Sequence, residues 1–485
     1  MNQQRPRFIM AALRGGAGKT TLSVAMTVAL REQGMAVTPF KKGPDYIDAA
    51  WLSRAASGPC YNLDTFLMGA DEVVRSFSRH TGEGAIAVIE GNRGLFDGVN
   101  AAGEFSTAEL AKLLHAPVIL IVDCDKVTRT AAAMVLGCLH LDGDVDIRGV
   151  ILSRVNGPRH ASVIRRSIED YTGLPVYGTV PRLPELPFAQ RHLGLVPPEE
   201  HNQILQALEK AGSIARDYLD IPALLGVAQS APPWKVDAFP KPARSYKTKN
   251  EQVTIGVIKD TAFQFYYQEN IEALTDRGAK VIQISALNEK YLPPVDALYI
   301  GGGFPETHAG RLAANESFRL SVKAAGEAGL PIYAECGGFI FLGESLLVGH
   351  RHYPMVGALP VSFGLEKRPQ GHGYTSLAVD QANPFFPVGQ TITGHEFHYC
   401  RILSKNDAET STAFNVLKGT GLDGRREGLC RKNILAGFTH VHALGTPGWA
   451  DAIMARASQY HRKKLNQAPV YVMDKPDIVK TEQTA

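Results

Sequence analysis

The sequence predicts an α/β protein with two domains: an N-terminal domain built on a parallel sheet and a C-terminal α/β domain. Three observations predict this class. Short apolar segments alternate with helical patterns through the first half of the 485 residues, which indicates βαβ units. A second series of strand-like segments begins near residue 250. A proline-rich, basic stretch separates the two series.

The N-terminal domain is expected to span residues 1–228. Its strands are predicted from apolar runs, and the segments between several of these runs have helical patterns. The expected strands are 8–13, 36–40, 85–91, 117–123 and 147–155, and the expected helices include 20–34 and 199–219.

The stretch QSAPPWKVDAFPKPARSYKTKN (229–250) is interpreted as a linker, although a long surface loop would have the same composition. The C-terminal domain is then expected at 251–465, followed by a polar tail at 466–485. Its expected elements are the strands 253–258, 280–284, 297–303, 331–338 and 436–442 and the helix 270–279.

Composition excludes several functional classes. A formal net charge of +3 is too small, for this length, to indicate a nucleic-acid partner. The six cysteines include no CxxC pair, which argues against a zinc site or a disulfide framework. No apolar run reaches the roughly 18–20 residues of a membrane helix, and the N-terminus does not read as a signal peptide. We therefore expect a soluble, cytoplasmic protein without a membrane partner.

The segment RGGAGKTT (14–21) follows a predicted strand and opens a predicted helix, the context that a phosphate-binding P-loop requires. Leu13 stands where the common pattern has glycine, so the match is to the GGxGK[ST] variant; the alternative is a glycine-rich turn. Small residues let backbone N–H groups approach phosphates. The residues expected to bind ATP are Gly15, Gly16, Gly18, Lys19, Thr20 and Thr21, with Thr20 also placed to hold Mg²⁺.

Four acidic residues follow predicted strands. Asp45 and Asp48 flank a tyrosine in KKGPDYID (41–48), Glu90 ends an apolar strand, and Asp97 lies in the loop after it. Ligands of open α/β sheets collect at the carboxyl ends of the strands, and a carboxylate beside a phosphate loop is a natural Mg²⁺ ligand. Each acid alone is equally compatible with a helix cap or a solvated loop residue.

Cys336 lies in PIYAECGG (331–338), between a predicted strand and a predicted helix. A sharp strand-to-helix turn exposes a nucleophile, and the glycines after Cys336 make such a turn sterically possible. The N-terminus of the following helix is expected to favour the thiolate. The alternative is a buried cysteine that acts as a small hydrophobe.

A nucleophilic thiol needs a base and an oxyanion hole. FTHVH (438–442) offers His440 and His442, and strand alternation predicts that both point to one face. An isolated HxH is also compatible with a structural or metal-binding role. The backbone N–H groups expected to form the oxyanion hole are those of Gly302, Gly303 and Gly337.

Eight motifs occur along the chain in this order: RGGAGKTT (14–21), KKGPDYID (41–48), NLDTF (62–66), GLFDG (94–98), GGGFPE (301–306), AECGG (334–338), GHEFHY (394–399) and FTHVH (438–442). As a set they resemble the cobyrinate a,c-diamide synthase family, from about residue 8 to about residue 462. The resemblance implies a P-loop NTPase-like domain of the dethiobiotin-synthetase type, followed by a class I glutamine amidotransferase-like domain.

The resemblance also implies a glutamine-hydrolysing carbon–nitrogen ligase that uses ATP and Mg²⁺. Such an enzyme activates a carboxylate of a tetrapyrrole polycarboxylate as an acyl phosphate and amidates it with ammonia from L-glutamine. The implied targets are the a and c acetate side chains of cobyrinate, or of a sirohydrochlorin-type relative such as sirohaem.

The resemblance assigns roles residue by residue. Cys336 matches the glutaminase nucleophile and His440 its base. The more familiar glutaminases have glutamate where this chain has His442, so a dyad is expected rather than a Cys-His-Glu triad. On the synthetase side, Lys19 and Thr20 match the phosphate and Mg²⁺ residues, and Asp48 and Glu90 match metal ligands. Asp45, Tyr46 and Asp97 match groups near the acid that is activated.

QGHGY (370–374) departs from the family's plainer LGY. This histidine-containing version is similar to branches that act on sirohaem or nickel-sirohydrochlorin. We expect His372 and His395 to face a macrocycle; the alternative is that both are structural.

Two other functions are compatible with part of the sequence. A partition-type ATPase switch would use the phosphate loop, with Arg14 at its signature-lysine position, but would not need Cys336 or a second domain. A cobyrate-synthase-like enzyme would amidate other side chains; KKGPDYID and NLDTF favour the a,c-diamide branch. A homodimer is compatible with the sequence, which leaves the order of amidations open.

Overall fold

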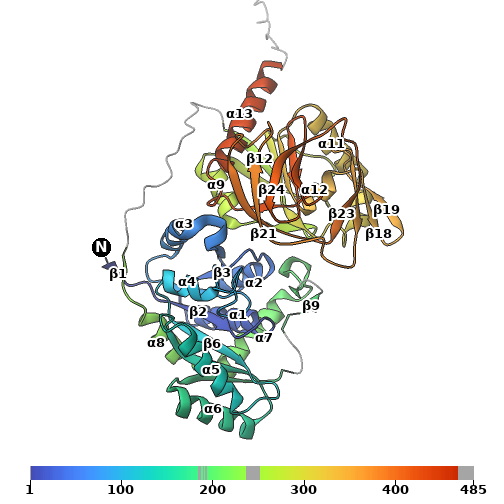
Figure 1. Ribbon diagram of the computed structural model, residues 1–485. Coiled ribbons are helices and arrows are strands. Elements are labelled where there is room, and N and C mark those ends of the chain that lie inside the picture. The colour runs from blue at the N-terminus through green and yellow to red at the C-terminus, as the bar shows by residue number, and fades with distance from the viewer. Residues whose placement is uncertain (1, 184–186, 189, 192–193, 236–251, 468–485) are drawn as a thin grey trace, which may run out of the picture.

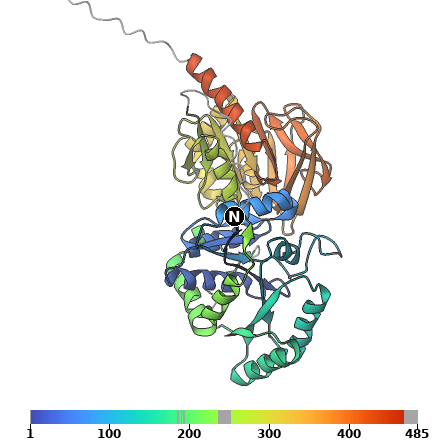
Figure 2. The ribbon, with the colours of Figure 1, turned by 90° about the vertical axis from the view of Figure 1, so that its left-hand side faces the viewer.

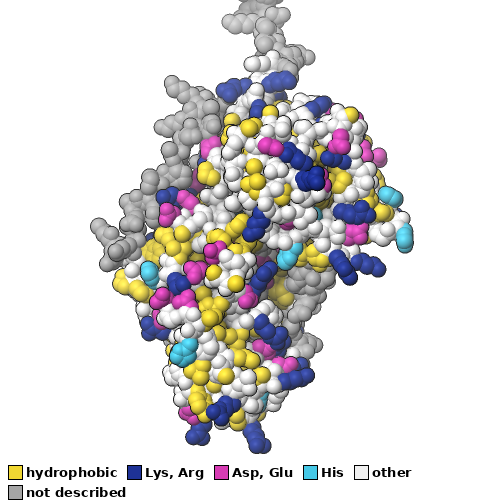
Figure 3. Space-filling view, viewed as in Figure 1, with side chains coloured by type: hydrophobic (Ala, Val, Ile, Leu, Met, Phe, Trp, Pro, Cys, Tyr) yellow, Lys and Arg dark blue, Asp and Glu magenta, His cyan; other side chains and the backbone are white. Residues whose placement is uncertain are grey.

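The computed structural model describes residues 2–183, 187–188, 190–191, 194–235 and 252–467. Two domains are stacked on one another, with the N-terminal half of the chain forming one and the C-terminal half the other (Figure 1). Positive and negative side chains are interspersed on the face shown in Figure 3, in keeping with the small net charge. No helix within the described residues is both long enough and apolar enough to span a bilayer.

The N-terminal sheet has seven parallel strands, in the order β4-β3-β5-β2-β6-β7-β8. Its central strands are buried on both faces, which explains why segments such as VILIVD read as continuous apolar runs. In sheet order the strands are Tyr61–Leu63, Val37–Lys42, Ile86–Glu90, Arg7–Ala12, Val118–Asp123, Ile147–Val155 and Val176–Pro181.

Helices cover both faces of this sheet, and each face has its own apolar core. One face is covered by α1 (Lys19–Glu32), α2 (Ile47–Ala56), α7 (Ile204–Tyr218) and α8 (Ile221–Gln229). The other is covered by α3 (Thr65–His80), α4 (Thr107–Leu113), α5 (Thr130–Leu141) and α6 (Pro158–Thr172). Short elements complete the domain: β9 (Gln190–Arg191), β10 (Gly194–Leu195) and the 3₁₀ turn η1 (Pro198–Glu200).

The C-terminal domain has a ten-stranded mixed sheet, in the order β14-β12-β15-β17-β26-β25-β24-β21-β22-β27. The first five strands are parallel: Lys280–Ile284, Thr254–Ile258, Ala297–Ile300, Ile332–Glu335 and Ile434–Gly437. The other five are antiparallel: Arg426–Arg431, Ser411–Lys418, Gly371–Val379, Thr391–His398 and His440–Val441.

Smaller elements surround this sheet. A four-stranded sheet contains β19 (Arg351–Pro354), β18 (Ser345–Val348), β20 (Val361–Leu365) and β23 (Cys400–Lys405), and β13 (Phe263–Phe265) pairs with β16 (Gly302–Gly303). One face packs against α10 (Ala309–Ala314), α11 (Glu316–Glu327) and α12 (Gly337–Leu342), and the other against α9 (Gln268–Asp276) and α13 (Trp449–Gln467).

Two predicted elements differ from the structure. The helix expected at 199–219 begins at Ile204, because the backbone at His201 is extended after η1. The strand expected at 436–442 is two strands: β26 pairs with β17, and β27 pairs with β22. The backbone N–H groups of Phe438 and Thr439 donate to the Glu427 carboxylate, at 2.6 and 3.2 Å, and so belong to neither ladder.

The predicted linker and tail fall largely outside the described residues. Of the linker, the described part contains the end of α8 and β11 (Trp234–Lys235), which pairs with β1 (Asn2–Gln3). Of the tail, α13 includes the first two residues, 466–467. The boundaries 1–228 and 251–465 stay a prediction.

The domains dock through α3 on one side and β22 with Leu444 and Gly445 on the other. In the turned view the blue helix α3 lies between the two domains (Figure 2). The Thr393 hydroxyl donates to the Leu67 carbonyl at 3.0 Å. Beside it, a Cβ on Gly445 would lie 1.7 Å from the same carbonyl oxygen. The absence of a side chain at Gly445 is therefore a condition for this close approach.

We expect Gly445→Ala to weaken the docking by about 1–3 kcal/mol, because the new methyl group forces α3 away. Amide hydrogen exchange would become faster in α3 and β22. Gly226→Ala is the matched control: it lies within α8 with no neighbouring atom within 4 Å of the new methyl group. Unchanged exchange in Gly445→Ala would show that the domains do not depend on this contact.

Candidate active site

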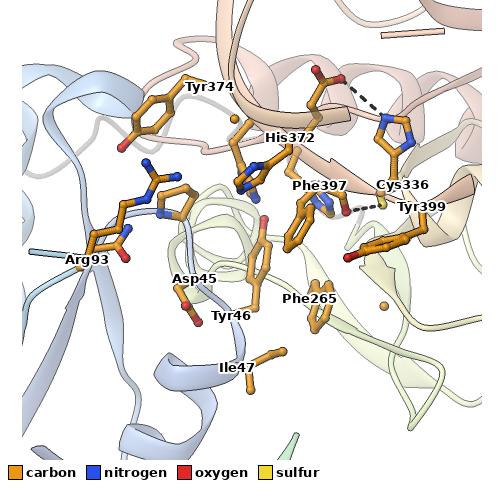
Figure 4. A pocket seen from close by; sticks show the side chains of 18 of the residues that line it. Asp45, Tyr46, Ile47, Arg93, Phe265, Cys336, His372, Tyr374, Phe397 and Tyr399 are labelled. Carbon is orange, nitrogen blue, oxygen red and sulfur yellow. Dashed lines mark hydrogen bonds and ion pairs between the residues drawn. The ribbon is translucent and has the colours of Figure 1, made fainter. Parts of the chain in front are cut away.

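Two cavities lie at the carboxyl ends of the strands. A cavity of about 500 Å³ is lined by residues of both domains (Figure 4). A second, of about 330 Å³, is lined by the phosphate loop and its neighbours. Asn92 and Arg93, which follow β5, line both. The two cavities therefore share one wall.

The phosphate loop connects β2 to α1 and turns through two glycines with positive φ, 71° at Gly16 and 95° at Gly18. Larger side chains rarely adopt this conformation. Lys19 folds back across the loop and donates to the carbonyls of Arg14 and Arg93, at 3.2 and 2.6 Å. Burial, followed by repulsion from Lys41, lowers the pKa of Lys19 to about 8. All six residues predicted to bind ATP line the smaller cavity.

The residues predicted to hold a metal lie together beside this loop. Glu90 Oε1 accepts hydrogen bonds from the Thr20 hydroxyl at 2.8 Å and from Lys41 Nζ at 2.9 Å. Lys41 also donates to Asp48 at 2.8 Å. Burial raises the pKa of Glu90 to about 7. Lys41 was not predicted from the sequence as part of this group. The pair of lysines at the start of KKGPDYID, followed by two acids, could have pointed to it.

This group fits Mg²⁺, which proteins commonly bind through one or two carboxylates completed by substrate phosphates and water. It offers one hydroxyl and two carboxylates, and within the described part of the chain Glu90 Oε2 is buried without a hydrogen-bond partner. Across the same described residues, no three His, Cys, Asp or Glu side chains gather into a metal-binding cluster. In such a site, a bound phosphate and water would supply the remaining ligands.

Asp45, Tyr46 and Asp97 line the larger cavity instead. Asp45 Oδ1 accepts the Asp48 N–H at 2.8 Å and so caps the first turn of α2. Desolvation in the cavity wall raises the pKa of Asp45 to about 6. Asp97 Oδ2 accepts the N–H of Gly94 at 2.8 Å. The predicted acids are thus divided between the two cavities.

Tyr46 reaches from the N-terminal domain into the C-terminal one, and Figure 4 shows it projecting beside Phe265. The two rings stack with centroids 5.2 Å apart. The Tyr46 ring also lies 5.3 Å from that of His440. Its buried hydroxyl has no hydrogen-bond partner among the described residues.

Cys336 forms the turn between β17 and α12 with φ of 46°, a strained value for a non-glycine residue. The turn needs small neighbours: a Cβ on Gly338 would lie 2.4 Å from the Ile300 carbonyl oxygen. The thiol lines the larger cavity and donates to the Phe397 carbonyl, with S and O 3.9 Å apart. The expected thiolate is not favoured, because burial raises the pKa of Cys336 well above its usual range. The thiol therefore needs a base.

His440 lines the same cavity as Cys336. Its ring stacks on that of His395 with centroids 4.8 Å apart, and its Nδ1 lies 3.7 Å from Glu335 Oε2. The prediction that His442 shares this face is wrong, because β27 ends at Val441. His442 packs on Tyr267 instead, with its Nε2 3.6 Å from Glu269 Oε2.

The three predicted oxyanion glycines pack around these groups. Gly303 lines the cavity. A Cβ on Gly302 would lie 2.4 Å from His440 Cε1, and one on Gly337 would lie 2.9 Å from the Gly303 nitrogen. The structure therefore brings both glycine-rich loops against the histidine and the thiol.

Both predicted macrocycle histidines line the larger cavity. His372 is exposed on β21, beside Phe397. His395 is buried, its Nδ1 lies 3.1 Å from the Tyr267 hydroxyl, and burial lowers its pKa well below the usual value. Sequence reasoning missed other residues of this wall, which are aromatic or basic: Arg93, Phe265, Tyr374, Phe397, Tyr399 and Lys418.

Both halves of the chain match known domain families. Residues 8–195 match the CobQ/CobB/MinD/ParA nucleotide binding domain, and residues 254–447 match the CobB/CobQ-like glutamine amidotransferase domain. The cobyrinate a,c-diamide synthase of Magnetococcus marinus is 41% identical over 92% of this chain and 96% of its own length. Those of Archaeoglobus fulgidus and Methanothermobacter thermautotrophicus are 38% and 39% identical over 93% and 92% of this chain, and 97% and 98% of their own.

The chain belongs to the cobyrinate a,c-diamide synthase family. Members of this family are glutamine-hydrolysing ligases, and the chain is an enzyme of that class. The predicted family and the predicted fold class are both confirmed.

Glu427 holds the segment that connects β26 to β27. It is buried, and its Oε1 accepts the N–H groups of Phe438 and Thr439. Burial raises the pKa of Glu427 to about 8. The folded protein thus keeps a proton that the unfolded chain releases near a glutamate's ordinary value of 4.5. This contribution to stability is fully present below that value and is lost as pH rises through about 8.

We expect Glu427→Gln to flatten this dependence, because the amide has no proton to release. Between pH 6 and 9 the wild-type protein would lose about 2–3 kcal/mol more stability than the variant. Thermal unfolding followed by circular dichroism at several pH values measures the difference. The exposed Glu83→Gln should behave like wild type. Parallel curves for Glu427→Gln and wild type would contradict the prediction.

Proposed function

We propose that this enzyme uses ATP, Mg²⁺ and L-glutamine to amidate the a and c acetate carboxylates of cobyrinate or a sirohydrochlorin-type relative such as sirohaem. One observation carries the proposal. Cys336 and His440 line the same cavity as Asp45 and Asp97, and that cavity shares a wall with the phosphate-loop cavity. Nitrogen released at the thiol has direct access to an acid activated at the shared wall.

The synthetase half would activate the acid. A carboxylate is a poor electrophile, and bound ATP with Mg²⁺ would supply the phosphoryl group that makes it an acyl phosphate. Lys19 and the glycine N–H groups would hold the phosphates, and Thr20, Asp48 and Glu90 would hold the metal. Arg93, which lines both cavities, is placed to hold the acid beside the transferred group.

The glutaminase half would release ammonia. Cys336 Sγ attacks the side-chain amide carbon of glutamine while His440 takes the thiol proton and returns it to the departing ammonia. The N–H groups of Gly303 and Gly337 stabilise the oxyanion. Water then hydrolyses the thioester to glutamate. The sharp turn that opens Cys336 into the cavity lined by His440 supports this assignment.

The composition of the wall suits a flat polycarboxylate. Tyr374, Phe397 and Tyr399 offer aromatic surface, and Arg93 and Lys418 offer positive charge to carboxylates. His372 is exposed and available to a macrocycle. His395 hydrogen-bonds to Tyr267 and stacks on His440, which favours a structural contribution.

Cys336→Ala tests whether glutamine hydrolysis and amidation occur at two separate centres. We expect it to abolish glutaminase activity and glutamine-dependent amidation, while ammonium salts still support amidation at a rate within about threefold of wild type. Product formation from each nitrogen source is measured in parallel. Loss of amidation with both sources would contradict two separable centres.

Lys19→Ala tests the synthetase half. Removing a positioned charge should lower amidation by about 10²–10³-fold with either nitrogen source, because activation of the acid precedes the use of ammonia. The control is basal glutaminase activity, which should persist. Undiminished amidation would exclude the phosphate loop from the reaction.

Mass spectrometry identifies the substrate. Cobyrinate, sirohaem and nickel-sirohydrochlorin are incubated in parallel with ATP, Mg²⁺ and glutamine. We expect one of them to accumulate a product with two amides and none beyond. More than two amides would favour a cobyrate-synthase-like activity, and no amide on any of the three would sink the proposal.

A further inference from the structure

We propose that Glu335 positions His440 for glutamine hydrolysis, acting as the carboxylate that the familiar triad takes from another part of the chain. The inference rests on the proposed glutaminase function and deepens it. Glu335 is the last residue of β17 and directly precedes Cys336, so acid and nucleophile come from one short segment.

The Glu335 carboxylate spans the gap between β17 and β27. It is 1% exposed. Its Oε1 accepts the N–H of Val441 at 3.1 Å, and its Oε2 accepts the Tyr299 hydroxyl at 3.1 Å. The Val441 contact fixes the backbone next to His440, and Oε2 lies 3.7 Å from His440 Nδ1. One carboxylate therefore holds both the strand and the ring that it carries.

His440 Nδ1 is buried and has no hydrogen-bond partner among the described residues. A charge partner at 3.7 Å is the group placed to receive its proton, and catalytic hydrogen bonds often shorten only when substrate binds. With the Nδ1 proton directed at Glu335, Nε2 keeps a free lone pair for the Cys336 thiol. The carboxylate also stabilises the imidazolium that forms when the thiol proton is taken.

The familiar Cys-His-Glu triad takes its carboxylate from a glutamate two residues after the histidine, and this chain has no glutamate at that position. Two residues after His440 stands His442, which lies outside the cavity lining and faces Glu269. Glu269 in turn accepts the N–H of Asn62, at 3.1 Å, from the N-terminal domain. The His442–Glu269 pair thus belongs to the domain junction, and Glu335 supplies the carboxylate at the base.

Glu335→Gln is the decisive variant. The Val441 N–H requires an acceptor, so the amide oxygen takes the Oε1 place and the amide NH₂ faces His440 Nδ1. Nδ1 then becomes the acceptor, and Nε2 carries the proton. In this tautomer His440 cannot take a proton from Cys336, although the fold and the position of the ring are kept.

The expected result is a fall in glutaminase kcat of about 10²–10⁴-fold, with the KM for glutamine within about threefold of wild type. The residual rate should rise steadily with pH, because hydroxide can replace His440 as base. Among the described residues, the titratable groups placed beside His440 are Glu335, His395, Tyr46 and Cys336, and the last three are unchanged in the variant. Amidation from ammonium salts should stay near the wild-type rate.

Glu427→Gln is the matched control, because Glu427 is another buried glutamate that holds backbone N–H groups beside β27 without contacting the His440 ring. Its glutaminase kcat should be within about threefold of wild type. A large fall in both variants, or a fall in Glu335→Gln that includes ammonia-dependent amidation, would show a purely structural role and overturn the inference. So would a Glu335→Gln kcat within threefold of wild type.

Two further variants separate the inference from its premise. If Cys336→Ala retains glutaminase activity, the proposed function fails; if Cys336→Ala is inactive and Glu335→Gln is normal, only the role of Glu335 fails. Should Glu335→Gln not fold, Glu335→Asp keeps the charge but withdraws it by one methylene. We then expect glutaminase kcat to fall about tenfold with ammonia-dependent amidation intact, and an unchanged kcat would overturn the inference.

Discussion

Hydrogen bonds from Asn62 fix the loop at residues 43–46 between the two domains, and the wall of the larger cavity depends on these bonds. The Asn62 side chain donates to the carbonyls of Gly43 and Asp45, at 2.8 and 3.0 Å, while its N–H donates to Glu269 of the C-terminal domain. The loop thereby presents Asp45 to the cavity and inserts Tyr46 against the ring of His440. A single buried asparagine thus ties the loop that lines the cavity to Glu269 of α9 in the C-terminal domain.

A second cross-domain contact explains the motif NLDTF, for which the sequence offered no role. Asp64 caps α3 through the N–H groups of Phe66 and Leu67. Its other oxygen accepts the Tyr374 hydroxyl at 2.5 Å and lies 3.4 Å from Lys42 Nζ. Asn62 and Asp64 therefore both serve the junction, where a buried carboxylate needs partners that satisfy it. Because Tyr374 and Lys42 line the larger cavity, the domain junction and the cavity wall are built from the same residues.

The sequence allowed prediction of the local loop and turn conformations, but not of the contacts between segments that are distant in the sequence. The phosphate loop and the turn at Cys336 were predicted because glycine spacing fixes backbone conformation over a few residues. The placement of His442 failed because β27 ends at Val441, and the pairing with β22 that fixes this short strand involves residues far away in the sequence. The antiparallel strands between 345 and 431 were missed for a similar reason, since their register is set by partners rather than by their own pattern. Glu335 was visible in AECGG, but only the structure places it beside His440.

Under the proposed function, the shared wall of Asn92 and Arg93 bears on how two amidations would proceed. Among the described residues, Asn92 and Arg93 line both the larger cavity and the phosphate-loop cavity, so under the proposed function the acid is activated beside them. Under the proposed function, an enzyme with one activating wall must release or turn its macrocycle between the a and c positions. Ammonia, by contrast, would not have to move to another cavity, because the Cys336 thiol lines the larger cavity in which the acid would be held. The order of the two reactions is then decided by which acetate the aromatic and basic wall presents first, a property of substrate fit rather than of either catalytic centre.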